Sequence, residues 1–259
     1  MVIVPAEHPL DWKKPPVITL LLIVINILIY FGYQGGDSTR REEAVRVYLE
    51  QDLLSHERPL FSASLERRER LKAEQQRALE GLPRQQLAWL VLSDLEFGHE
   101  LRGLPAFQQD AAWQAARTQA EAARDQTSSL RFGFIPQRFT VQGLFGSMFL
   151  HGSFWHLAGN MVFLFIFGFA LEAALGRLLY LGLYLFSGLC SGLLWWALDP
   201  SWVPGIGASG AISGLMGMYI GVYGLRRIQF FYWLGPLIGY LKAPALWILP
   251  LWLGKELFG

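Results

Sequence analysis

Apolar residues gather in long blocks along this chain, and one polar block separates the first of them from the rest. The uncharged runs are close to the length of about 20 residues that a helix needs to cross a bilayer. We therefore expect an all-α, polytopic helical membrane protein with five spans, at residues 17–35, about 149–171, 180–198, 207–225 and 243–257. The aromatic stretch 228–241 is expected to lie on or to enter the membrane.

The polar block covers residues 36–131 and is dominated by Arg, Glu, Gln and Ala. These residues favour helix, and opposite charges at helical spacing support it. Breaks at Pro59, Pro83 and Pro105 predict three or four helices in a charged insert outside the membrane. Its two histidines have polar neighbours and no ligand partners at metal-binding spacing, so both are expected at the surface.

Basic residues in the short connections set the expected orientation. A tail at 1–16 precedes the first span, and a membrane core is expected at 132–259. Short loops rich in Lys and Arg face the cytoplasm, whereas long domains are exempt from this rule. With the amino terminus inside, the short-loop charges all agree, and the insert falls in the first extracytoplasmic loop. The expected location is a bacterial inner (plasma) membrane.

Composition excludes several classes of function. The chain is 53% hydrophobic, has a net charge of +1 and contains one cysteine, Cys190. A disulfide, a CxxC redox pair and a cysteine-based zinc site are therefore excluded. The charge does not indicate a nucleic-acid partner. No phosphate-binding loop is present, and we expect no metal and no cofactor.

A serine flanked by glycines opens the run at 207–225. Glycines recur at steps of three and four residues along it, at 207, 210, 214, 217, 221 and 224. Such a bare helix face lets another helix approach closely in a membrane. Ser209 lies beside it at the expected helix start, where free backbone amides suit a developing negative charge. By itself this pattern is also that of a packing helix with one incidental serine.

A second polar group interrupts the run at 149–171. His156 and Asn160 are four residues apart and so share a helix face, while His151 lies nearer the membrane surface. Polar side chains inside a bilayer are costly and mark functional candidates. At about 1.5 Å per residue, Asn160 lies roughly a dozen ångströms deeper than His151. Ser209 and the His156–Asn160 pair can thus share one layer in the outer half of the membrane.

The two motifs together resemble the rhomboid family of intramembrane serine proteases. The resemblance rests on FGSMFLHGSFWHLAGNM at 145–161 and GASGAISG at 207–214, and it covers about 132–258 plus the first helix. It implies a rhomboid-like bundle in which Ser209 is the nucleophile. His156 and Asn160, with the Ser209 amide, would bind the oxyanion. His151, Gly207 and Gly210 would support the site.

The resemblance also implies substrates that are single-span membrane proteins, cleaved near the outer face, with membrane lipid as the surroundings. Nothing in the sequence sets the oligomeric state, the cleaved sequence or the role of the insert. Two departures from the family pattern stand out. The family's base is a histidine on a sixth helix, but all five histidines here precede Ser209. We expect a chain that stops before that helix and is inactive as given.

The second departure is in the first loop. Many relatives carry Trp-Arg eight residues before the first motif histidine, where this chain has Gln142-Gly143. Arg138 is nearby but out of register, so the anchoring of the loop is open.

Three other readings stay open. One is a non-catalytic rhomboid-like protein that binds transmembrane clients. Another is a channel or transporter lined by the histidines, although the sequence shows no internal repeat. The third is a Ser-Lys hydrolase using Lys242 or Lys255, which the expected topology puts far from Ser209.

Overall fold

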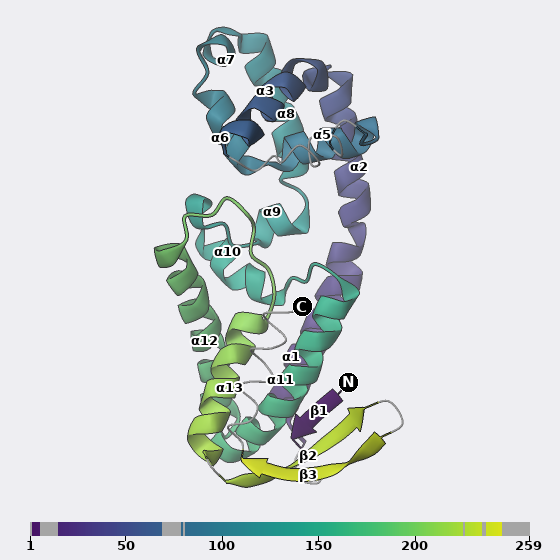
Figure 1. Cartoon of the computed structure of the whole chain (residues 1–259). Coiled ribbons are helices and arrows are strands. Elements are labelled where there is room, and N and C mark those ends of the chain that lie inside the picture. Colours follow the sequence, from purple (N-terminus) through teal and green to yellow (C-terminus); the bar gives the residue numbers. More distant parts are fainter. Residues whose placement is uncertain are drawn as a thin grey trace.

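The protein consists of a membrane bundle and a helical insert stacked end to end (Figure 1). The computed structural model describes residues 2–5, 15–68, 79, 81–224, 226–234 and 237–244. The described helices of the bundle are α1 (Val17–Leu28), α10 (Val141–Gly146), α11 (Phe154–Leu175), α12 (Arg177–Leu198) and α13 (Ser209–Tyr223). Short 3-10 turns, η3 (Pro136–Arg138) and η4 (Ser147–Phe149), flank α10. The all-α fold class is confirmed.

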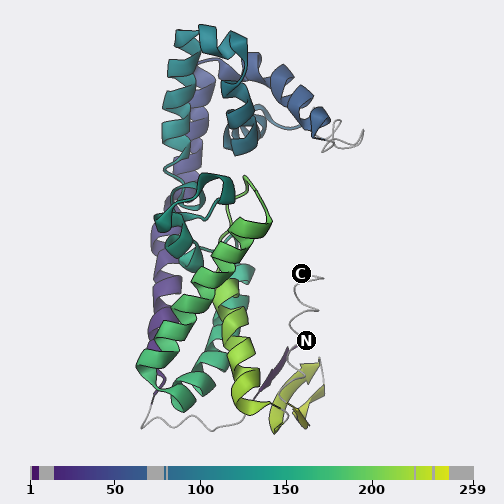
Figure 2. The same ribbon diagram turned by 90° about the vertical axis from the view of Figure 1, so that its left-hand side faces the viewer.

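One rod joins the two parts. From α1 the chain continues through a π-helical turn, η1 (Ile29–Tyr33), and a 3-10 turn, η2 (Gln34–Gly36), into α2 (Asp37–Glu50) (Figures 1 and 2). Among the described residues, three helices are long and apolar enough to cross a membrane: Val17–Glu50, Phe154–Leu175 and Arg177–Leu198. The serine helix α13 is shorter, with 15 residues. The chain is an integral membrane protein.

The bundle core is built around α11. This helix packs against α1, α12 and α13, so within the described bundle it is more central than the serine helix. Its buried side chains meet those of α13 in one apolar cluster that includes Leu164, Phe167, Ile212 and Leu215. Asn26 on α1 is buried as well, and its amide donates to the Leu22 carbonyl of its own helix at 2.7 Å.

Glu172, near the end of α11, caps the start of α1. The backbone N–H groups of Ile18 and Thr19 donate to its carboxylate at 3.0 and 2.9 Å, and the Thr19 hydroxyl donates at 2.9 Å. Pro16, the residue before α1, offers no side-chain cap of its own. A carboxylate at a helix N-terminus satisfies unpaired donors and complements the helix dipole. This cap therefore holds the start of α1 against the end of α11.

The glycines of α13 do not form one uniform packing face. A Cβ atom at Gly210 or Gly214 would collide with Ser191 or Ser187 of α12, so these two glycines allow close approach of that helix. At Gly217 and Gly221, no described atom lies within 4 Å of the position a Cβ would take. The predicted stripe is thus divided between a close contact with α12 and an open part.

The insert is a helical domain with its own core. It contains more helices than the three or four predicted, because short helices form between the expected breaks. Those described are α2, α3 (Leu53–Arg67), α5 (Arg84–Ser93), α6 (Leu95–Arg102), α7 (Pro105–Gln109), α8 (Ala111–Arg124) and α9 (Ser128–Phe132). Its apolar cluster includes Tyr48, Phe61, Val91 and Phe97. Pro59 lies inside α3 and does not end it, contrary to the prediction.

A small antiparallel sheet lies at the other end of the bundle (Figure 1). Its strand order is β1 (Val2–Pro5), β2 (Arg227–Leu234) and β3 (Leu237–Pro244). Val4 pairs with Phe231, and Phe231 pairs with Tyr240. Within the stretch 228–241, residues 228–234 and 237–241 are strand, as aromatic and β-branched residues favour. Its expected place on or in the membrane stays a prediction. The predicted span 243–257 starts inside β3, and its remainder, 245–257, lies outside the described residues.

Candidate functional site

Ser209 is the first residue of α13, and a glycine turn leads into it. Gly207 has φ +132°, a conformation that L side chains rarely adopt, and its N–H donates to the Ser147 carbonyl at 2.8 Å. The first regular helical bond of α13 runs from Ile212 N–H to the Ala208 carbonyl at 3.0 Å. The N–H groups of Ser209, Gly210 and Ala211 therefore have no carbonyl partner within α13, as predicted for the start of this helix.

Gly207 also brings the two motifs together. A Cβ atom at this position would lie 2.8 Å from Nε2 of His156 and 3.7 Å from Nδ2 of Asn160. The imidazole and the amide therefore lie directly against the backbone two residues before Ser209. No side chain larger than hydrogen fits there, which explains physically why a glycine occupies the position.

The beginning of α11 holds the two polar side chains in place. Ser153 caps this helix by accepting from the N–H of His156 at 3.1 Å. Asn160 follows one turn later and is 0% exposed. Neither its amide nitrogen nor its amide oxygen has a hydrogen-bond partner among the described residues. An unpaired buried amide is costly, and such a group in a native protein calls for an explanation, such as a ligand or a catalytic role.

His151 lies in the turn before α11, outside the spanning helices. Its ring is 1% exposed, and its centroid is 5.2 Å from that of His156, with the planes at 71°. Burial, and secondarily the neighbouring His156, lower the pKa of His151 to about 4. The imidazole is thus neutral at physiological pH and acts by packing or by neutral hydrogen bonding.

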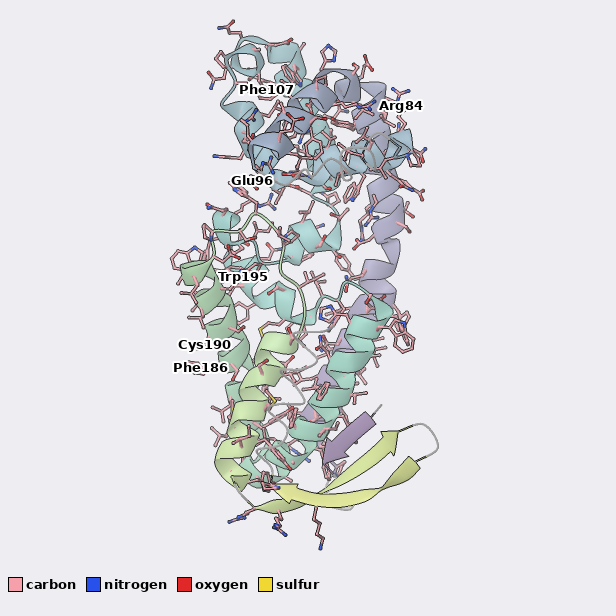
Figure 3. All side chains as sticks on the ribbon, viewed as in Figure 1. Arg84, Glu96, Phe107, Phe186, Cys190 and Trp195 are labelled. Carbon is pink, nitrogen blue, oxygen red and sulfur yellow. The ribbon has the colours of Figure 1, made fainter. Side chains whose placement is uncertain are left out.

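A cavity of about 210 Å³ opens on the other side of Ser209, between α12, α13 and η4. Three serines line it, Ser147, Ser191 and Ser209, together with Trp195 and Met148. Figure 3 shows Trp195 and, further along the same helix, Cys190 and Phe186. Cys190 is exposed. Gly210 lines the cavity too, so its place is beside the serine, facing α12.

Sequence reasoning missed Gln34. Its amide nitrogen donates to the His151 carbonyl at 3.0 Å, and its amide oxygen accepts from the His151 N–H at 2.9 Å. This pair of bonds joins the outer end of the first helix to the turn before His156. The two residues are 117 positions apart, so no spacing pattern could have indicated the contact.

The first loop is anchored in a different way from the family pattern. A Cβ atom at Gly143 would lie 2.7 Å from the Gly133 carbonyl oxygen, so the position that carries Arg in many relatives has no room for a side chain here. Arg138 ties the loop instead. Its guanidinium donates to Asp125 at 3.1 Å and to the Leu130 carbonyl at 2.8 Å.

Comparison with known proteins agrees with these features. The family model described as "Rhomboid domain" matches residues 138–256. Rhomboid protein 1, mitochondrial, of Saccharomyces cerevisiae is 34% identical over 93 residues, which is 34% of this chain and 27% of that protein. YdcA of Bacillus subtilis, named as a candidate rhomboid protease, is 39% identical over 71 residues, covering 27% of this chain and 36% of that protein.

A third relative, RHOMBOID-like protein 5 of Arabidopsis thaliana, is 35% identical over 92 residues, or 34% of this chain and 30% of that protein. The matched region thus spans about a third or less of each of these relatives. No solved structure matches the chain. The matched region contains both motifs, and this part of the chain is similar to a rhomboid domain.

Proposed function

We propose that the protein is an intramembrane serine endopeptidase that cleaves single-span membrane proteins near the outer membrane face. The observation that supports it most is the meeting at Gly207, where His156 and Asn160 lie against the backbone that leads into Ser209. The Asn160 amide has no hydrogen-bond partner among the described residues, so it is available as a donor to a bound group.

In the proposed reaction, the Ser209 hydroxyl attacks the peptide carbonyl carbon and gives its proton to a general base. The tetrahedral intermediate carries a negative oxygen, which His156, Asn160 and the Ser209 amide would stabilise. Collapse of the intermediate breaks the C–N bond, releases the protonated amine and leaves an acyl-serine. Water then attacks the ester, returns the hydroxyl to Ser209 and releases the carboxylate product.

The base is the part of this mechanism that the described residues do not provide. The chain has five histidines, and all of them precede Ser209. We propose His156 as an oxyanion donor and His151 as its support, so neither takes the role of base. Without a partner base a serine hydroxyl is a weak nucleophile. Residues 1–259 alone should therefore cleave slowly.

The direct test measures cleavage of a single-span membrane protein in liposomes, with the full-length product of the gene. Ser209→Ala should lower the rate by at least about a thousandfold. The matched control is Ser213→Ala, one turn later on the same helix, which should cleave as the wild type does. Equal rates for Ser209→Ala and the wild type would refute the assignment. Residues 1–259 tested alongside would show whether they suffice.

A second candidate is a non-catalytic protein that binds transmembrane clients, and the position of all histidines before Ser209 favours it. The same assay separates the two. A client that co-purifies with the full-length protein but is never cleaved, in the wild type or in Ser209→Ala, supports binding alone.

For orientation, we propose that the insert and the 199–204 loop face outward in a bacterial inner membrane. Both lie at one end of the bundle, whereas the start of α12, at Arg177, and the start of β2, at Arg227, lie at the other end (Figure 1). This distribution agrees with the excess of basic residues in cytoplasmic loops. Labelling of a cysteine placed at position 70 only from the cytoplasmic side would contradict it.

A further inference from the structure

We infer that the insert positions the loop that leads to Ser209 through the packing contact between His99 and Trp202. The consequence for catalysis rests on the proposed function, but the contact itself does not. His99 lies on α6, and Trp202 lies in the loop between α12 and α13. The two rings are stacked, with centroids 4.9 Å apart and planes at 30°.

Trp202 is held by more than one element. It packs on a small apolar cluster of Leu95, Leu130 and Ile135, which is separate from the cores of the insert and of the bundle. Leu95 and His99 are four residues apart on α6, so they present one face of this helix to the indole. Trp202 thus packs against α6, α9 and the segment after α9.

The other side of the loop is fixed to the bundle. Phe134 and Gly205 exchange two backbone hydrogen bonds, of 3.0 and 2.8 Å. Gln137 donates to the Ser201 carbonyl through its N–H and to the Pro200 carbonyl through its side chain, both at 3.1 Å. Between these two attachments, the side chain of Trp202 holds the loop against the insert.

The insert can serve as a fixed support because it is attached elsewhere. The rod from α1 to α2 gives one attachment to the bundle, and the contact of Arg138 with Asp125 gives a second. Within the insert, Asp37 at the start of α2 accepts from the Ser128 N–H at 3.0 Å and from the Ser128 hydroxyl, so α9 is tied to the rod. Movement of the loop therefore does not require movement of the insert.

A cleft beside the contact leaves the loop room to move. Its volume is about 560 Å³, and it lies between residues 90–96 of the insert and residues 199–204 of the loop. In Figure 3, Glu96 lies at the edge of the insert that faces the bundle, and Trp195 lies below it near the end of α12. In the cleft, no described side chain packs between the insert and the loop. The stacked rings of His99 and Trp202 therefore carry a large share of what restrains the loop against the insert.

The loop is short, so its position reaches the serine. Only six residues separate Trp202 from Ser209, and among them Gly207 holds the contact with His156 and Asn160. A loop released at Trp202 loses one of the constraints that keep Gly207 against the two side chains; the backbone bonds of Gly205 to Phe134 and of Gly207 to Ser147 remain. His99 and Trp202 are thus positioning residues, whose loss should reduce kcat more than it raises KM.

The test compares hydrogen exchange of the 199–207 backbone in full-length variants. His99→Ala should raise the exchange rate by about two- to tenfold, the range that an aromatic pair contributes. His99→Phe keeps a ring on Trp202 and should restore wild-type exchange and kcat. The matched control is His56→Ala, an exposed histidine of the insert whose neighbour, Trp113, belongs to the insert itself. It should change neither quantity.

Unchanged exchange at 199–207 in His99→Ala would overturn the inference, provided that amides of α8 report a folded insert. Exchange needs no catalysis, so the inference stands or falls separately from the proposed function. If exchange rises in His99→Ala while Ser209→Ala still cleaves, the positioning is correct and the protease assignment is wrong. If exchange is unchanged and Ser209→Ala is inactive, the reverse holds.

Discussion

Glu57 in the insert and Asn160 in the bundle are both 0% exposed, yet their surroundings are opposite. Both carboxylate oxygens of Glu57 are used: Trp113 donates to one at 3.0 Å, and Tyr48, at 2.9 Å, and Arg117 donate to the other. Asn160 has no partner for either amide atom among the described residues. A satisfied buried polar group holds a structure together, whereas an unsatisfied one indicates a group kept for something else.

The largest effect should come from breaking the satisfied cluster. Glu57→Ala leaves Tyr48, Trp113 and Arg117 without this acceptor, and each buried donor left unsatisfied costs about 1–3 kcal/mol. Arg117 keeps its second carboxylate partner, Glu121, at 3.1 Å. Denaturant unfolding of the insert in detergent micelles measures the change. Glu43→Ala is the matched control, because Glu43 pairs with Arg46 at an exposed site and should unfold as the wild type does. Equal stability of the Glu57 and Glu43 variants would contradict the comparison.

The unsatisfied group should respond in the opposite sense. Asn160→Leu replaces an unpaired amide with an apolar side chain of similar size, so thermal stability should stay the same or rise. The barrier to cleavage should rise by about 2–4 kcal/mol, the contribution of one oxyanion donor. Asn26→Leu, at a buried amide of α1 that bonds to its own helix, is the control and should keep full activity. Full cleavage by a folded Asn160→Leu protein would reject the role.

A smaller effect separates the two halves of the glycine face. Gly214→Ala pushes a methyl group into Ser187 of α12 and should cost about 1–3 kcal/mol of stability. Gly217→Ala enters open space among the described residues and should be neutral or stabilising, because alanine favours helix. Thermal unfolding of both variants tests this difference. An equal loss for Gly217→Ala would show that another segment packs on that half.

The sequence was sufficient where the signal is local. Blocks of apolar residues located α1, α11, α12 and α13, and the free amides before Ile212 follow from where the helix starts. It also indicated that Ser209, His156 and Asn160 share a layer, and the structure brings the last two against Gly207. Whether these three residues catalyse stays a prediction.

Contacts between distant segments could not be read in this way. Gln34 meets His151, and His99 meets Trp202, across stretches with no common period. The strands within 228–241 were not predicted, because apolar aromatic residues suit a membrane surface and a strand equally well. The glycine face was read as one surface because periodicity gives the side of a helix but not the neighbour that covers it.

The rod of α1 and α2 has a mechanical consequence. It contains 34 residues, so it is about 50 Å long, against about 30 Å for the hydrocarbon part of a bilayer. A helix adapts to a thicker or thinner membrane by tilting. Because the rod is continuous from residue 17 to residue 50, a change in its tilt within the membrane would also move the insert. Lipid chain length is therefore a variable that cleavage assays should scan, since it acts on the insert without any change of sequence.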